Sequence, residues 1–140
     1  MNKVIIDKMI LSAMDILEEN TLGILEKDKK IQSKYYGYIA AFGPSLMQTG
    51  LIQCIAFYSK TQTKEDKDRK KIIQLMEETL ERTGRIKKAE HEKNLFQHLK
   101  NQLKDAPFYT RKRFTSYIME ACTACKLAIR TFPKIDTKEG

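Results

Sequence analysis

The sequence predicts an all-α protein, a compact single-domain bundle of about six helices spanning residues 1–140. Three observations lead to this prediction. Apolar residues recur three and four positions apart almost throughout, and strict alternation is nowhere sustained. Lys, Glu, Leu, Ile and Ala, which favour helix, fill the long segments. Three prolines, six glycines and no tryptophan leave little material for an all-β or loop-rich fold.

The first three helices are predicted over residues 3–19, 27–42 and 44–59. Asn2 is placed as the N-cap of the first, because its side chain can accept from free backbone N–H groups. Gly43-Pro44 is expected to end the second helix and to start the third, since glycine favours the position after a helix and proline the first turn. Their apolar stripes contain Ile6, Ile10, Ala13, Leu17, Ile31, Tyr35, Ile39, Phe42, Leu46, Leu51 and Ile55.

Gly50 falls in the middle of the predicted third helix. A glycine there costs about 1 kcal/mol relative to alanine. We therefore expect a close helix crossing at Gly50, where no side chain fits.

The remaining helices are predicted over residues 65–83, 86–104 and 108–132. Gly84 ends the first of these, Asp105-Ala-Pro107 separates the other two, and Pro133 closes the last. Residues 134–140 are expected to be frayed. The stripes contain Ile72, Ile73, Leu75, Met76, Leu80, Leu95, Phe96, Leu99, Leu103, Phe114, Ile118, Cys125 and Ile129.

The charge is unevenly distributed along the chain. Lys plus Arg number 26 against 18 Asp plus Glu, a formal net charge of +8, and residues 1–60 contribute only +1 of it. A basic excess predicts attraction to polyanions. The basic surface is therefore expected on the C-terminal two-thirds of the chain.

The final predicted helix presents a basic stripe beside its apolar face. Lys112, Lys126 and Arg130 project on that side with Ser116 and Thr123, whereas Glu120 projects elsewhere. Cations and hydroxyls without a carboxylate suit phosphate contact, although the same residues would also make an ordinary solvated face. Arg111 is a further candidate, and a second, weaker basic patch contains Lys29, Lys30 and Lys34. The tyrosines fall mostly in or beside apolar stripes, so little base readout is expected.

No residue pattern indicates a metal or cofactor site, and none is predicted. Cys54, Cys122 and Cys125 are interpreted as small buried residues of a chain in a reducing cytoplasm. His91 and His98 are interpreted as solvated helix residues. The uncharged run over residues 35–59 is interpreted as a buried hairpin and not as a membrane span, because Gln48, Gln53 and the Gly-Pro pair interrupt it.

One arrangement leaves an enzymatic alternative open. The spacing of Arg85 and His91 on a predicted helix resembles that of the HEPN family of helical ribonucleases, which act as dimers on RNA. The motif is short, and the residue after Arg85 is Ile86, where that family usually has a polar residue.

Residues 35–58 read YYGYIAAFGPSLMQTGLIQCIAFY. This segment resembles the signature of the Cmr-type small subunit of type III-B CRISPR RNA-guided effector complexes. The family joins two helices through a proline, continues to Gly-Leu, and ends in an aliphatic-Ala-Phe segment. Tyr109 and Arg111 resemble its C-terminal part, whereas Thr49 replaces an asparagine often found before the glycine. The signature positions in this chain are Gly43, Pro44, Leu46, Gly50, Leu51, Ala56 and Phe57.

The resemblance implies a non-catalytic helical subunit for antiviral defence. Its copies would stack head to tail into a minor filament along the duplex of guide RNA and target RNA. Its other partners would be the backbone and large subunits, which would carry out the chemistry, and no membrane is involved. The small subunit of the other type III complex, also helical and basic, is the nearest alternative.

Overall fold

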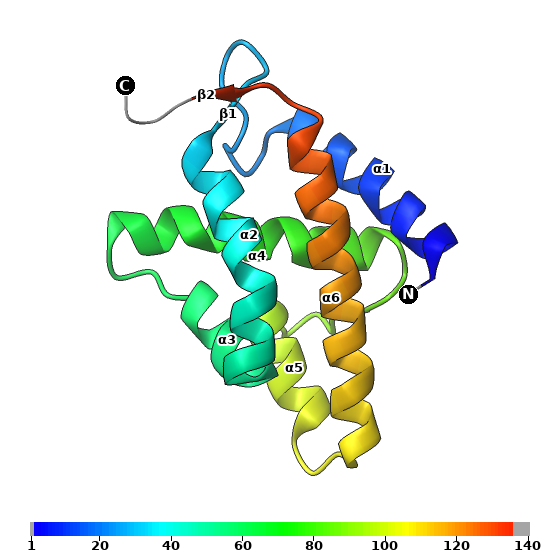
Figure 1. The fold of residues 1–140 in the computed structure, drawn as a ribbon. Coiled ribbons are helices and arrows are strands. Elements are labelled where there is room, and N and C mark those ends of the chain that lie inside the picture. The colour runs from blue at the N-terminus through cyan, green and yellow to red at the C-terminus, as the bar shows by residue number, and fades with distance from the viewer. Residues whose placement is uncertain (1, 136–140) are drawn as a thin grey trace.

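A computed structural model describes residues 2–135 of the chain (Figure 1). Within this range the fold is all-α, as predicted, with one pair of two-residue strands. The helices are α1 (Lys3–Glu19), α2 (Ser33–Thr49), α3 (Leu51–Tyr58), α4 (Lys64–Arg82), α5 (Leu95–Leu103) and α6 (Phe108–Arg130), and the strands are β1 (Ile31–Gln32) and β2 (Lys134–Ile135).

Helix α6 is the longest helix and packs against α1, α2 and α4 (Figure 1). Helix α4 crosses behind α2 and α6, while α3 and α5 lie at the lower end of the view. The core forms where these helices meet, and its fully buried large side chains include Met9, Ile16, Ile39, Phe42, Ile55, Ile72, Leu75, Met76 and Leu80. Burial of these stripes is the main stabilising contribution.

Helix α1 has the predicted bounds and the predicted cap. The Asn2 side chain accepts hydrogen bonds from the backbone N–H groups of Val4 (3.1 Å) and Ile5 (3.3 Å). The C-cap of the helix is Asn20, which adopts the left-handed conformation (φ 58°). Its side-chain amide donates to Leu25 O and accepts from Leu25 N, each at 2.9 Å. The helix and its exit turn are thus closed by two asparagines.

The predicted break at Gly43-Pro44 is wrong. Helix α2 runs without interruption through both residues to Thr49. Proline inside a helix costs about 3 kcal/mol. Pro44 faces solvent, however, and the buried stripe continues on both sides of it from Phe42 to Leu46. Burying that continuous stripe outweighs the local cost.

The beginning of α2 also differs from the prediction. The helix starts at Ser33, and residues 27–30 form a turn in which Lys29 has φ 57°. Strand β1 follows that turn and pairs in parallel with β2, in register Ile31 with Lys134. Residues 134 and 135 are therefore ordered in a strand, and the rest of the predicted frayed tail, 136–140, lies outside the described residues. Tyr36 Oη fastens the same corner by donating to Phe132 O at 2.5 Å.

Gly50 separates α2 from α3, so the prediction of a mid-helix crossing there is wrong. The residue has φ 93° and ψ 164°, and a Cβ built on it would have no atom within 4 Å. Such a conformation is essentially restricted to glycine. Gly50 is therefore required by the backbone turn and not by a close packing contact.

Helix α4 begins with a capping box formed by Thr63 and Asp66, and its predicted extent is nearly right. The predicted fifth helix is shorter than expected, because residues 86–94 form a loop. Helix α5 starts at Leu95, where Asn94 accepts from Gln97 N at 2.9 Å. Glu77 of α4 accepts from Leu95 N at 2.6 Å, and a carboxylate at a helix N-terminus is stabilising. A contact with a distant helix thus determines where α5 begins.

Candidate nucleic-acid interface

The basic stripe predicted on the last helix lies on the solvent side of α6. Lys112, Ser116 and Arg130 are exposed, and Thr123 and Lys126 are half-buried. We call these five residues the α6 cationic strip. The opposite face of the helix is buried in the core. The periodicity of α6 therefore separates a packing face from a basic face, as the sequence predicts.

The cations of the α6 cationic strip are free of carboxylate partners among residues 2–135. None of Lys112, Lys126 and Arg130 takes part in an ion pair there. Glu120, the one acidic residue of α6, is buried, and Arg85 Nη2 lies 2.9 Å from its Oε1. The positive charge of the strip is thus available to an anionic partner.

Two aromatic rings are exposed at the start of α6, which the sequence analysis did not anticipate. Phe108 is 73% exposed and Tyr109 67%. Lys112 Nζ lies 5.9 Å from the centroid of the Phe108 ring. The other tyrosines are buried or half-buried, and burial raises the pKa of Tyr35 and Tyr58 to about 12. The sequence feature that could have indicated their exposure is their position directly after Pro107, before the apolar stripe of α6 begins.

Arg111 lies away from the strip, at a hollow between α3, α5 and α6. The hollow has a volume of about 310 Å³. Its floor is apolar and its rim is basic, and it is lined by Ile52, Phe96, Leu103, Lys100, Lys104 and Arg111. We call it the α5 groove.

The second predicted patch does not form a uniform basic surface. Lys29 and Lys30 are exposed in the turn before β1. Lys34, in contrast, pairs with Asp68 of α4 at 2.7 Å, and Lys71 approaches the same carboxylate at 3.7 Å. The charge of Lys34 is therefore offset by a carboxylate from a different helix.

The signature residues lie on α2, on α3 and at the turn between them, and only Leu46 and Leu51 among them are buried. Pro44 is exposed, and a Cβ on Gly43 would lie 3.8 Å from Met119 Cε of α6. Leu51 is buried in the core. Phe57 is 43% exposed, and the Arg69 guanidinium lies 4.5 Å from its ring centroid.

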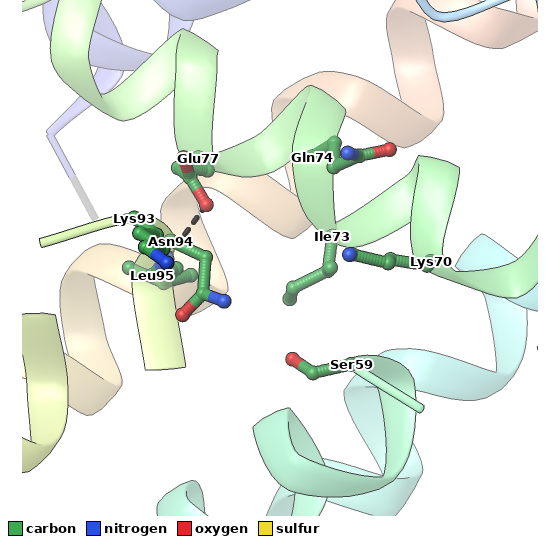
Figure 2. A pocket seen from close by; sticks show the side chains of 8 residues that line it. All are labelled: Ser59, Lys70, Ile73, Gln74, Glu77, Lys93, Asn94 and Leu95. Carbon is green, nitrogen blue, oxygen red and sulfur yellow. Dashed lines mark hydrogen bonds between the residues drawn. The ribbon is translucent and has the colours of Figure 1, made fainter. Parts of the chain in front are cut away.

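A small pocket of about 230 Å³ lies between α4 and the start of α5 (Figure 2). Its lining includes Ser59, Lys70, Lys93 and Asn94. The carboxylate of Glu77, at the edge of this pocket, already has two partners. It accepts a hydrogen bond from Leu95 N and pairs with Lys88 Nζ at 2.6 Å. These contacts give the pocket walls a structural role.

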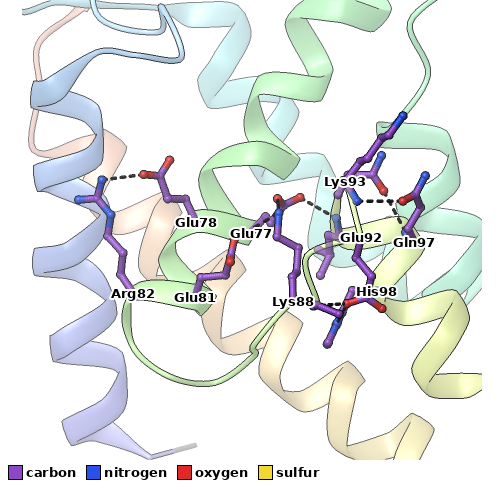
Figure 3. A network of polar contacts seen from close by, with 12 residues as sticks. Glu77, Glu78, Glu81, Arg82, Lys88, Glu92, Lys93, Gln97 and His98 are labelled. Atoms are coloured by element: carbon purple, nitrogen blue, oxygen red, sulfur yellow. Dashed lines mark hydrogen bonds and ion pairs between the residues drawn. The ribbon is translucent and has the colours of Figure 1, made fainter.

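Figure 3 shows the polar contacts around the loop over residues 86–94, which joins α4 to α5. Arg82 pairs with Glu19 of α1 (2.7 Å) and with Glu78 (2.6 Å). Glu92 lies 2.9 Å from Nδ1 of His98. His98 is 3% exposed, so its interpretation as a solvated histidine is wrong. His91 is exposed in the loop.

Arg85 and His91 do not share a helix. Both lie in the segment between α4 and α5. The Arg85 guanidinium is held by Glu120 and lies 4.4 Å from the centroid of the Tyr117 ring. The helical spacing on which the ribonuclease alternative depends is therefore absent from this segment.

The three cysteines are free and buried, as predicted. Burial raises the pKa of Cys122 to about 11 and that of Cys125 to about 12. Such thiols are protonated and inert at neutral pH. Among the described residues, no three His, Cys, Asp or Glu side chains gather as a metal site would require. None of the helices described over 2–135 has the length and apolar character needed to cross a bilayer.

Comparison with known proteins gives one result. Residues 20–131, four-fifths of the chain, match the model of a protein family described as CRISPR-associated protein (Cas_Cmr5). The matched range begins at residue 20, directly after α1, runs through α6 and includes the α6 cationic strip. No curated protein and no solved structure matches the chain.

Proposed function

The chain belongs to the Cas_Cmr5 family, the small subunits of type III-B CRISPR complexes, and we propose that it acts there as a non-catalytic RNA-contacting subunit in antiviral defence. In this role its copies line up as a minor filament beside the guide–target RNA duplex. Its partners are the guide and target RNA, other copies of itself, and the backbone and large subunits. Its three buried free cysteines suit the cytoplasm.

The observation that supports RNA contact most strongly is the α6 cationic strip. Lys112 and Arg130 are 18 positions apart, which corresponds to about 27 Å along a helix. A strip of that length can follow several phosphates of one strand. Lysine and arginine side chains contact phosphates without reading sequence. We therefore expect binding to RNA of any sequence.

A non-catalytic role is supported by what the candidate catalytic residues do in the fold. Arg85 stabilises the buried carboxylate of Glu120, and His91 lies on a loop without a nearby partner of its own among residues 2–135. Neither position provides the paired acid and base that RNA cleavage needs.

Stacking of copies would make weak contacts effective. A single strip with three cations binds weakly, but aligned copies convert each further contact into an intramolecular one. The filament would therefore bind long duplexes much more tightly than one subunit binds a short RNA. The exposed rings of Phe108 and Tyr109 add a surface on which a base can stack at the end of the strip.

The test is the salt dependence of RNA affinity. Replacing Lys112, Lys126 and Arg130 together by alanine should reduce affinity for all sequences. The slope of log affinity against log salt should shrink by about 2 for single-stranded RNA, because three phosphate contacts no longer release counterions. A matched triple variant, Lys64→Ala, Lys67→Ala and Lys87→Ala, removes the same charge from exposed positions elsewhere. Equal effects of the two triple variants on the slope would refute the assignment of the strip.

A further inference from the structure

We propose that the exposed face of α1 in one copy docks in the α5 groove of the next copy. This inference rests on the proposed function, since it identifies the two surfaces through which copies would stack. The occupant of the groove is thus a second copy of this chain. Three observations carry it: an unpartnered face on α1, a complementary groove, and the placement of the two at different ends of the fold.

The outer face of α1 combines apolar and acidic side chains. Val4 and Leu11, seven residues apart and so on one side of the helix, are each 63% exposed. Asp7, Asp15 and Glu18 are exposed around them, and two exposed cations, Lys3 and Lys8, lie on the same helix. None of these three carboxylates takes part in an ion pair within residues 2–135. The face therefore combines exposed apolar side chains with three carboxylates and two cations, a net charge of −1.

The α5 groove has the opposite character. Its apolar floor, formed by Ile52, Phe96 and Leu103, is flanked by Lys100, Lys104 and Arg111. These three cations are exposed and are free of ion pairs among the described residues. Asp105 is the only acidic residue between 95 and 119. Leu11 can fill the apolar hollow while Asp7 and Asp15 meet the basic rim, an arrangement that favours one partner and register.

The two surfaces cannot meet within one molecule. Helix α1 lies at the upper right of Figure 1, packed on α4 and α6, whereas α5 lies at the bottom. A contact between different patches on two copies is head-to-tail, and each added copy leaves one α1 face and one groove open. Repetition of this contact produces a stack of subunits.

A charge-exchange experiment without RNA tests the proposal. One variant carries Asp7→Lys and Asp15→Lys, and the other carries Lys100→Glu and Lys104→Glu. All four positions are exposed, so both variants should fold, which circular dichroism checks. By sedimentation velocity at low salt, the wild type should associate with rising concentration, and each variant alone should associate at least about tenfold more weakly. An equimolar mixture should recover association, because each altered surface then meets its complement. Association of the separate variants at the wild-type level, or no recovery in the mixture, would overturn the proposal.

A second measurement detects an interface too weak for sedimentation. In the double variant Leu11→Cys, Lys104→Cys, mild oxidation should give a ladder of disulfide-linked oligomers, because a disulfide needs the two Cα atoms within about 7 Å. The native cysteines are buried and should not form disulfides under mild oxidation. The control, Thr21→Cys with Lys104→Cys, places the first thiol beyond α1 and should give no ladder. A monomeric wild type together with no ladder would refute the interface, while the α6 salt-slope result would stand or fall independently.

Discussion

Glu92 Oε1 lies 2.9 Å from Nδ1 of His98, and both side chains are only 4% exposed. The same carboxylate accepts from Ala89 N at 2.8 Å and from Asn101 Nδ2 at 2.9 Å. One side chain in the loop over residues 86–94 thus binds its own loop and two positions of α5. These contacts connect a segment without regular structure to the helix whose side chains line the α5 groove.

This relationship predicts how stability depends on pH. Hydrogen bonds from His98, then Asn101 and Ala89, lower the pKa of Glu92 from 4.5 to about 2. A carboxyl group with a lowered folded-state pKa contributes stability that is fully present above its unfolded value and is lost as pH falls through the folded value. Glu92→Gln should therefore lower the urea midpoint at pH 7, and its difference from the wild type should shrink between about pH 4.5 and pH 2.

The control for this experiment is Glu90→Gln, an exposed glutamate two positions away in the same loop. Its urea midpoint should follow the wild type at every pH. If the deficit of Glu92→Gln stayed constant from pH 7 to pH 2.5, the ionised carboxylate would not be the stabilising species.

Gly50 provides a test of backbone strain against packing. Because φ is 93° and the surroundings are open, Gly50→Ala and Gly50→Leu should both lose about 1–3 kcal/mol of unfolding free energy, with similar values. A much larger loss for leucine would indicate a crowded site. Gly37 is the matched control, since it is exposed within α2 with no atom near a built Cβ. Gly37→Ala should leave stability unchanged or raise it by about 0.5–1 kcal/mol.

Replacing Arg85 should lower the stability of the fold, whereas replacing His91 should not. Arg85→Ala leaves the Glu120 carboxylate buried without its cation, which should cost about 1–3 kcal/mol in unfolding free energy. Replacing both partners, as Arg85→Met with Glu120→Leu, should recover much of that loss. His91→Ala should have no measurable effect, because the side chain is exposed.

The same variants decide the ribonuclease alternative. We expect no cleavage of labelled RNA by the purified wild type, with or without divalent metal. Cleavage that is present in the wild type and disappears in His91→Ala, which should remain folded, would establish catalysis. Arg85→Ala alone is less informative, since its loss of stability could mimic a loss of activity.

Phe108 and Tyr109 should contribute to single-stranded RNA binding and not to folding. Their rings are largely exposed, so Phe108→Ala with Tyr109→Ala should leave the thermal midpoint unchanged. Stacking of one base on an aromatic ring is worth about 1–3 kcal/mol, so affinity for single strands should fall about tenfold or more. Affinity for a blunt duplex, whose bases are already stacked, should change little. Equal losses for both RNAs would indicate that the rings act only through neighbouring cations.

Local sequence signals determined the all-α class, the bounds of α1, the approximate extents of α4 and α6, and the exposure of the basic strip on α6. Each depends on a cap or on periodicity within one segment, so it can be read without knowing what the segment packs against. Long-range contacts decided the rest. Helix α2 passes through Pro44 because its apolar stripe is buried on both sides. Helix α5 begins at Leu95, whose backbone N–H donates to the Glu77 carboxylate of α4. Glu120 is buried with its charge paired to Arg85, which comes from the segment between α4 and α5. These partners lie far apart in the sequence, and only the packed structure brings them within bonding distance.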